Sequence, residues 1–127
     1  MPIVQGAVYW IPNAEVIFRP QEKFDISKPR RPALIISGPL MNDNFPIVLV
    51  CPISHSTTNK TPYCVKVSDG ELQRIDGKSW IRTSCIFPIE KSYLEARYFI
   101  GHLPGETLDL VKTRILQLQG FLDESTE

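Results

Sequence analysis

Prolines are spread along the whole chain, and they restrict its fold more than any other feature of the sequence. Eleven of the 127 residues are proline and seven are glycine. Proline lacks a backbone N–H, breaks helices and is confined to the ends and edges of sheets. Short apolar runs lie between these residues, so the chain is predicted to form many short strands rather than long helices.

Six runs are predicted to be strands. Two of them, Ala33–Ile36 and Ile47–Ile53, are continuously apolar, which is typical of strands buried on both faces. The Asp-Gly pairs at 69–70 and 76–77 fit tight hairpin connections. The remaining predicted strands are Val8–Ile11, Tyr63–Val67, Ser79–Phe87 and Tyr98–Ile100.

The last regular element is predicted to be a helix over Gly105–Gln119. Its apolar side chains recur every three or four residues, and this stripe indicates a core or dimer surface. Pro104 suits the first turn, and Gly120 is placed to end the helix. The stripe consists of Leu108, Val111, Ile115, Leu118 and Leu122. The elements together predict a mainly β fold with a C-terminal α-helix, in the form of a small, strongly curved β-barrel.

The length predicts one domain, residues 1–122, followed by a short acidic tail at 123–127. The chain has no apolar stretch of about 20 residues and no signal-peptide pattern, which favours a cytoplasmic protein outside the membrane. Its three cysteines are an odd number without C-x-x-C spacing, so neither a disulfide framework nor a zinc site is expected. We interpret Cys51, Cys64 and Cys85 as small buried hydrophobes.

The formal net charge is zero, but the charges are unevenly distributed. Residues 19–31 contain five basic and two acidic side chains, and residues 74–82 contain three basic and one acidic. From Lys91 onward, six acidic side chains outnumber four basic ones. Two basic segments that converge would form a groove suited to a phosphate backbone. The alternative is an ordinary solvated loop.

Five segments, taken in order, resemble the MazF/PemK/Kid family of toxin endoribonucleases. The similarity extends over residues 6–119, and the R-P-x-L-I-I step is its most specific part. The segments are Gly6-Ala7-Val8-Tyr9-Trp10, Arg31-Pro32-Ala33-Leu34-Ile35-Ile36-Ser37, Val50-Cys51-Pro52-Ile53-Ser54, Trp80-Ile81-Arg82-Thr83-Ser84 and Ile100-Gly101-His102-Leu103.

The resemblance implies an SH3-like barrel that forms a homodimer. It also implies an enzyme that cleaves single-stranded RNA, often messenger RNA, at short sequences, with no metal or other cofactor. An antitoxin protein is the implied second partner. One departure from the family pattern is the segment from Ile11 to Arg30, which is longer than usual and lacks glycine.

Three candidate catalytic residues follow from the resemblance and from the chemistry of RNA cleavage. Attack by the 2′-hydroxyl creates a dianionic phosphorane, which a guanidinium binds with two parallel hydrogen bonds. Arg31 matches the family's R-P arginine, and Ser54 matches the Ser/Thr that contacts the scissile phosphate. Arg82 matches the catalytic arginine of the Kid-like branch. Strand alternation predicts Arg82 and Ser84 on one face.

The general base is less defined. The Kid-like branch has an Asp where this chain has Ser84, and serine is a poor base. His55 directly follows Ser54 and is the candidate substitute, because an imidazole changes its charge near neutral pH. We interpret His102 as structural. The residues expected to bind substrate are Lys28, Arg30, Lys60, Arg74, Lys78 and Ser84.

Two other functions remain open from the sequence. The substitution of Asp by Ser84 and the altered segment after the first strand favour a non-catalytic SH3-like module that binds RNA or protein. A Cys- or Ser-dependent hydrolase that uses His55 is a weaker alternative, because the sequence contains no matching Asp or oxyanion motif.

Overall fold

A curled antiparallel sheet and a C-terminal helix make up most of the computed structural model. The model describes residues 2–12, 30–55, 61–67, 72, 75 and 79–124. The strands are β1 (Ala7–Pro12), β2 (Arg30–Ile35), β3 (Ile47–Ser54), β4 (Val65–Val67), β5 (Ser79–Ile81), β6 (Phe87–Glu90) and β7 (Phe99–His102). The helices are α1 (Pro39–Asn44) and α2 (Gly105–Leu118), with the 3-10 turns η2 (Lys91–Tyr93) and η3 (Ala96–Tyr98).

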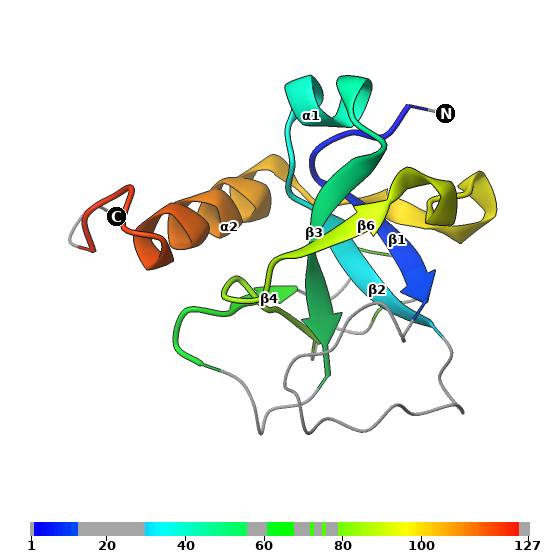
Figure 1. Cartoon of the computed structure of the whole chain (residues 1–127). Coiled ribbons are helices and arrows are strands. Elements are labelled where there is room, and N and C mark those ends of the chain that lie inside the picture. Colours follow the sequence, from blue (N-terminus) through cyan, green and yellow to red (C-terminus); the bar gives the residue numbers. More distant parts are fainter. Residues whose placement is uncertain are drawn as a thin grey trace, which may run out of the picture.

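The sheet runs in the order β4-β5-β3-β2-β1-β7, and every pairing is antiparallel. β3 is long enough to pair with two strands on the same side. Its first half pairs with β6, and its last two residues pair with β5. This fork curls the sheet into a half-barrel, with α2 on one side of it (Figure 1).

Two apolar clusters cover opposite faces of the sheet, as the alternation of side chains along β1 requires. The helix-side core includes Val8, Leu34, Cys51, Ile53, Val65, Ile81 and, from α2, Val111. The β6-side core includes Tyr9, Ile11, Ala33, Ile35, Val50 and, from β6, Ile89. The central strands are therefore buried on both faces, which explains the continuously apolar runs in the sequence.

The predicted fold class is confirmed, and most of the predicted strands agree with the structure to within two residues at each end. The predicted strand Ser79–Phe87 is wrong as a single element. A turn separates β5 from β6, because the Cys85 amide donates to the Arg82 carbonyl oxygen at 3.0 Å. The Thr83 hydroxyl holds this turn by donating to the Tyr63 carbonyl oxygen at 2.8 Å.

Helix α1 is absent from the sequence predictions because its six residues are too few to show a helical period. A small polar network sets its position. The Asn42 side-chain amide donates to the Ser37 carbonyl oxygen at 2.8 Å, and the Leu49 amide donates to the Ser37 hydroxyl at 3.0 Å. Both Asn42 and Ser37 are buried, so these bonds tie α1 to the start of β3.

The cysteines differ from the prediction in part. Cys51 is buried, whereas Cys64 and Cys85 are half-buried, and all three are free thiols. Neither helix in the described ranges has the length and apolar character needed to cross a membrane. The division into residues 1–122 and a tail at 123–127 stays a prediction.

Candidate functional site

Four neighbouring strands bring four side chains into one line across the sheet. The β2–β3 register pairs Ala33 with Pro52, and continued by two residues it sets Arg31 opposite Ser54. Ser54 is paired with Trp80 on β5, which is in turn paired with Lys66 on β4. We call this line, Arg31–Ser54–Trp80–Lys66, the transverse row.

All members of the transverse row share one face of the sheet. Ile53 and Ile81 belong to the helix-side core, so their neighbours Ser54 and Trp80 face the opposite way. The same reasoning applies to Lys66, which lies between the buried residues Val65 and Val67. Arg31, Ser54 and Trp80 are half-buried, and Lys66 is exposed. The row therefore offers two cations, a hydroxyl and an indole to solvent.

Arg82 lies beside the transverse row, one step along the sheet. Its backbone amide donates to the Pro52 carbonyl oxygen at 2.9 Å, which places it two residues from the level of Ser54. Only 4% of its surface is exposed. The backbone of Arg82 therefore lies near that of Ser54, on the opposite side of β3 from β2.

His55 directly follows β3, and its side chain does not share the face of the transverse row. Its Nδ1 is hydrogen-bonded to the Ser79 hydroxyl at 3.2 Å, and Ser79 is fully buried. Because adjacent residues of a strand alternate, His55 extends toward the face opposite to that of Ser54. Its backbone is next to the row, and its ring is held by β5.

Two further predicted residues lie apart from the row. Ser84 is exposed in the turn after β5, so the expectation that it shares a strand face with Arg82 is wrong: the strand ends at Ile81. Arg30 stacks on Tyr98, with its guanidinium carbon 3.5 Å from the ring centroid. Its Nη1 also donates to the Trp10 carbonyl oxygen at 3.4 Å.

The other predicted substrate-binding residues lie outside the described residues. They are Lys28, Lys60, Arg74 and Lys78. Most of the basic segment 19–31 also lies outside them, so the predicted convergence of two basic segments stays a prediction.

The sequence predictions do not place Trp80 or Lys66 in the candidate site. Trp80 belongs there to a family-like segment, and Lys66 to a predicted alternating strand. The signal that could have found them was the alternation itself: each is a large or charged side chain between two buried ones. Their shared row depends on strand register, which the sequence alone does not reveal.

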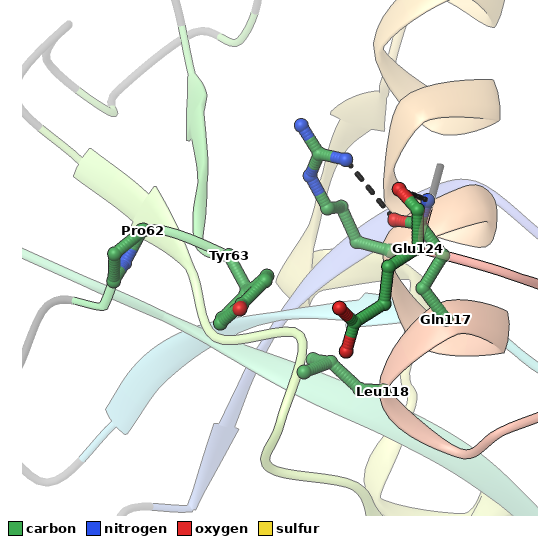
Figure 2. A pocket seen from close by; sticks show the side chains of 6 residues that line it. Pro62, Tyr63, Gln117, Leu118 and Glu124 are labelled. Carbon is green, nitrogen blue, oxygen red and sulfur yellow. Dashed lines mark hydrogen bonds between the residues drawn. The ribbon is translucent and has the colours of Figure 1, made fainter. Parts of the chain in front are cut away.

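A pocket of about 440 Å³ lies elsewhere, between α2 and the segment at 61–64 (Figure 2). Arg114 donates to the Gln117 side-chain oxygen at 3.1 Å, and Gln117 donates to the Glu124 carbonyl oxygen at 3.3 Å. These bonds fold the C-terminal segment back on the helix. The lining residues are Pro62, Tyr63, Arg114, Gln117, Leu118 and Glu124, and none of them belongs to the predicted site.

The protein is thus a small, mainly β protein with a curled sheet. One face of that sheet carries the cations and the hydroxyl of the transverse row. A family model described as "PemK-like, MazF-like toxin of type II toxin-antitoxin system" matches residues 5–118. The chain therefore belongs to the PemK-like, MazF-like toxin family, and the resemblance in its sequence is confirmed. A comparison with curated proteins gives no match.

Solved structures of low sequence identity share the fold. A MazE–MazF structure from Deinococcus radiodurans has a TM-score of 0.68 and 17% identity, covering 96% of this chain and 99% of that chain. An endoribonuclease in complex with its cognate antitoxin, from a mycobacterial species, has a TM-score of 0.69 and 18% identity, covering 94% and 97%. The Mycobacterium tuberculosis toxin MazF-mt6 has a TM-score of 0.66 and 17% identity, covering 91% and 98%.

Proposed function

We propose that this chain is an endoribonuclease toxin that cleaves single-stranded RNA, with messenger RNA as its substrate, and requires no metal. The 2′-oxygen of the substrate attacks the adjacent phosphorus, and the bond from phosphorus to the 5′-oxygen breaks. The products end in a 2′,3′-cyclic phosphate and a 5′-hydroxyl. The observation that supports the proposal is that Arg31, Ser54 and the backbone of Arg82 lie on neighbouring segments of one sheet in a member of this family.

Arg31 and Ser54 are the groups that we assign to the scissile phosphate. They lie on neighbouring strands, each two residues beyond the last paired residues, Ala33 and Pro52. A guanidinium and a hydroxyl on adjacent strands can reach two oxygens of one phosphate. Their hydrogen bonds strengthen as charge builds on the phosphorane, which lowers the barrier.

Arg82 and His55 support this centre in different ways. Arg82 is buried, so its guanidinium acts as a fixed positive charge beneath the phosphate, in a medium less polar than water. We assign the proton transfer to His55, the imidazole next to Ser54 in the chain. Its ring is bonded to Ser79 on the other face of the sheet, so this role requires the ring to leave Ser79 and turn toward Ser54 when RNA binds.

Arg31→Ala tests the assignment of Arg31 to the scissile phosphate most directly. We expect cleavage of a long single-stranded RNA to fall by about 100-fold or more, because one transition-state donor is lost. Arg31→Lys keeps the charge without the bidentate geometry and should be intermediate. Arg97→Ala is the matched control, since Arg97 is 68% exposed and pairs with Glu95. The assay is run in EDTA, and the fragments are tested for 2′,3′-cyclic phosphate ends.

The outcomes separate the proposed functions. Full activity of Arg31→Ala contradicts the site assignment. Intact RNA that is nevertheless bound by the wild-type protein supports a non-catalytic RNA-binding module instead. His55→Gln should lower the cleavage rate about 100-fold with little change in RNA affinity. His102→Gln is its control, because His102 is an exposed residue of β7 that packs edge-on against Phe99.

The partners follow from the same proposal. We infer a homodimer in the cytoplasm, and an antitoxin that covers the cationic face. Two of the similar structures support the second partner, since a MazE–MazF pair and an endoribonuclease with its cognate antitoxin share this fold. Expression of the chain alone should arrest bacterial growth, and co-expression of the product of a neighbouring gene should relieve the arrest. Unimpaired growth without the second protein contradicts this inference.

A further inference from the structure

Arg30 ties the first residue of β2 to a segment on the far side of β1. Its guanidinium carbon lies 3.5 Å from the centroid of the Tyr98 ring, and its Nη1 donates to the Trp10 carbonyl oxygen at 3.4 Å. In the sheet, β1 lies between β2 and β7, and Tyr98 directly precedes β7. The Arg30 side chain therefore crosses β1 and links three neighbouring segments. We call this arrangement of Arg30, Trp10 and Tyr98 the arginine clamp.

The arginine clamp is placed where the sheet has few backbone donors. The β1–β2 pairing ends at Pro12 and Arg30, and Pro32 is paired with Trp10 nearby. Neither proline has an N–H to donate to a neighbouring strand, so this end of the sheet has fewer backbone hydrogen bonds. The stacked guanidinium and its hydrogen bond to the Trp10 carbonyl oxygen supply side-chain contacts in their place.

Tyr98 is a fixed anchor for the clamp. Its ring is half-buried and packs against the β6-side core. Its backbone amide closes the η3 turn by donating to the Glu95 carbonyl oxygen at 2.9 Å. The next residue, Phe99, is paired with Tyr9 of β1, and their rings meet edge-on with centroids 5.5 Å apart. Because this segment is held at both ends, the Tyr98 ring can set the position of Arg30.

We propose that Tyr98 and Arg30 are positioning residues, which orient Arg31 toward the scissile phosphate through the arginine clamp. Arg31 lies between Arg30 and Pro32 in the chain. Pro32 restricts Arg31 to extended backbone on one side, and the clamp fixes its neighbour on the other. The direction in which the Arg31 side chain leaves β2 is thereby set before RNA binds. This inference rests on the proposed ribonuclease function, and it gives Arg30 a positioning role in place of the predicted substrate contact.

A double-mutant cycle with Arg31 tests whether the clamp acts through it. Tyr98→Leu removes the ring and should lower the cleavage rate at saturating RNA about 10-fold, because a misplaced transition-state donor loses much of its effect. In the Arg31→Ala background the same change should cost less than about 2-fold, since the positioned group is already absent. Arg30→Met keeps the side-chain length without the cation and should reproduce both results. Tyr98→Phe keeps the ring and should retain most of the activity.

Two control variants separate positioning from loss of stability. Arg97→Ala removes a second guanidinium from the same ring, 4.6 Å from its centroid, and should change the rate less than about 2-fold because Arg97 is exposed. Val111→Ala weakens the helix-side core and should lower thermal stability without lowering the rate at a temperature where the protein is folded. Full activity of Tyr98→Leu, or an equal loss in both Arg31 backgrounds, overturns the positioning role.

Backbone motion at Arg31 reports on the clamp without RNA and without cleavage. NMR relaxation should give the Arg31 amide of the wild-type protein an order parameter of about 0.85, typical of rigid backbone, and Tyr98→Leu should lower it toward about 0.6. An unchanged order parameter in Tyr98→Leu overturns the clamp even where the wild-type protein cleaves RNA. A lowered order parameter in a protein that leaves RNA intact in EDTA supports the clamp and overturns only the ribonuclease function.

Discussion

At the scale of single residues, burial determines which chemically active side chains can react. Cys51 lies in the helix-side core with no exposed surface, and burial raises the pKa of its thiol to about 12, with nearby Cys85 adding to the rise. A thiol in this state is a poor nucleophile, because the thiolate is the reactive form. The structure therefore gives no support to a hydrolase based on Cys51.

Cys51 should resist alkylation in the folded protein. At pH 8, brief treatment with iodoacetamide is expected to modify the half-buried Cys64 and Cys85 well before Cys51, as measured by peptide mapping. In the unfolded chain the thiol loses its proton near pH 9.0, and in the folded chain near 12. Its contribution to stability is thus complete below pH 9 and is lost as the pH rises toward 12. Labelling of all three at one rate in native buffer would contradict this assignment.

At the scale of elements, α2 is held to the sheet through one narrow stripe. Val111 is fully buried in the helix-side core, whereas its neighbour Leu110 is 43% exposed. The predicted stripe is confirmed at Val111, while Leu118 and part of its surroundings stay accessible beside the pocket. Position on the helix, rather than hydrophobicity, decides which apolar side chains stabilise the fold.

Val111→Ala should destabilise the protein by about 2 kcal/mol, from the lost transfer free energy of its methyl groups and the cavity that remains. Leu110→Ala should change the free energy of unfolding by less than about 0.5 kcal/mol, apart from any contact made in an assembly. Urea denaturation of the two variants against wild type measures both values. A larger loss in Leu110→Ala than in Val111→Ala would mean that the helix docks through its other face.

At the scale of the whole molecule, the net charge is zero but RNA binding is expected to be electrostatic. The transverse row concentrates two cations on one face, and neutralised phosphates release counterions whatever the total charge is. Affinity for RNA should therefore fall as salt rises. The zero net charge of the chain therefore does not argue against a polyanionic ligand.

The slope of log Kd against log salt counts the phosphate contacts. With a single-stranded DNA 12-mer, which lacks the 2′-hydroxyl and is not cleaved, between about 50 and 200 mM KCl, Arg31→Ala and Lys66→Ala should each reduce the slope by about 0.7. Arg97→Ala, at an exposed ion pair with Glu95, serves as the reference. An unaltered slope in both Arg31→Ala and Lys66→Ala would contradict the binding of nucleic acid along the transverse row.

The sequence by itself determined the fold class, most of the strands and the C-terminal helix. It could do so because the alternation of apolar residues and the placement of proline and glycine are local properties. Its family-like segments also give Arg31, Ser54 and Arg82 as candidate site residues, which stay a prediction. The split of Ser79–Phe87 is not predicted, because the turn there is held by a hydrogen bond to the distant Tyr63. Helix α1 is not predicted, because six residues are too few to show a helical period.

Only the tertiary structure decided which of these side chains share a face. Register pairs Ser54 with Trp80 and Trp80 with Lys66, extends the β2–β3 pairing toward Arg31, and brings His55 to Ser79. A shift of one residue would reverse every one of these placements, and no local pattern specifies the pairing of strands that are distant in the chain. Candidate site residues could be named from the sequence, but their arrangement depends on the folding of β2, β3, β4 and β5 into one sheet.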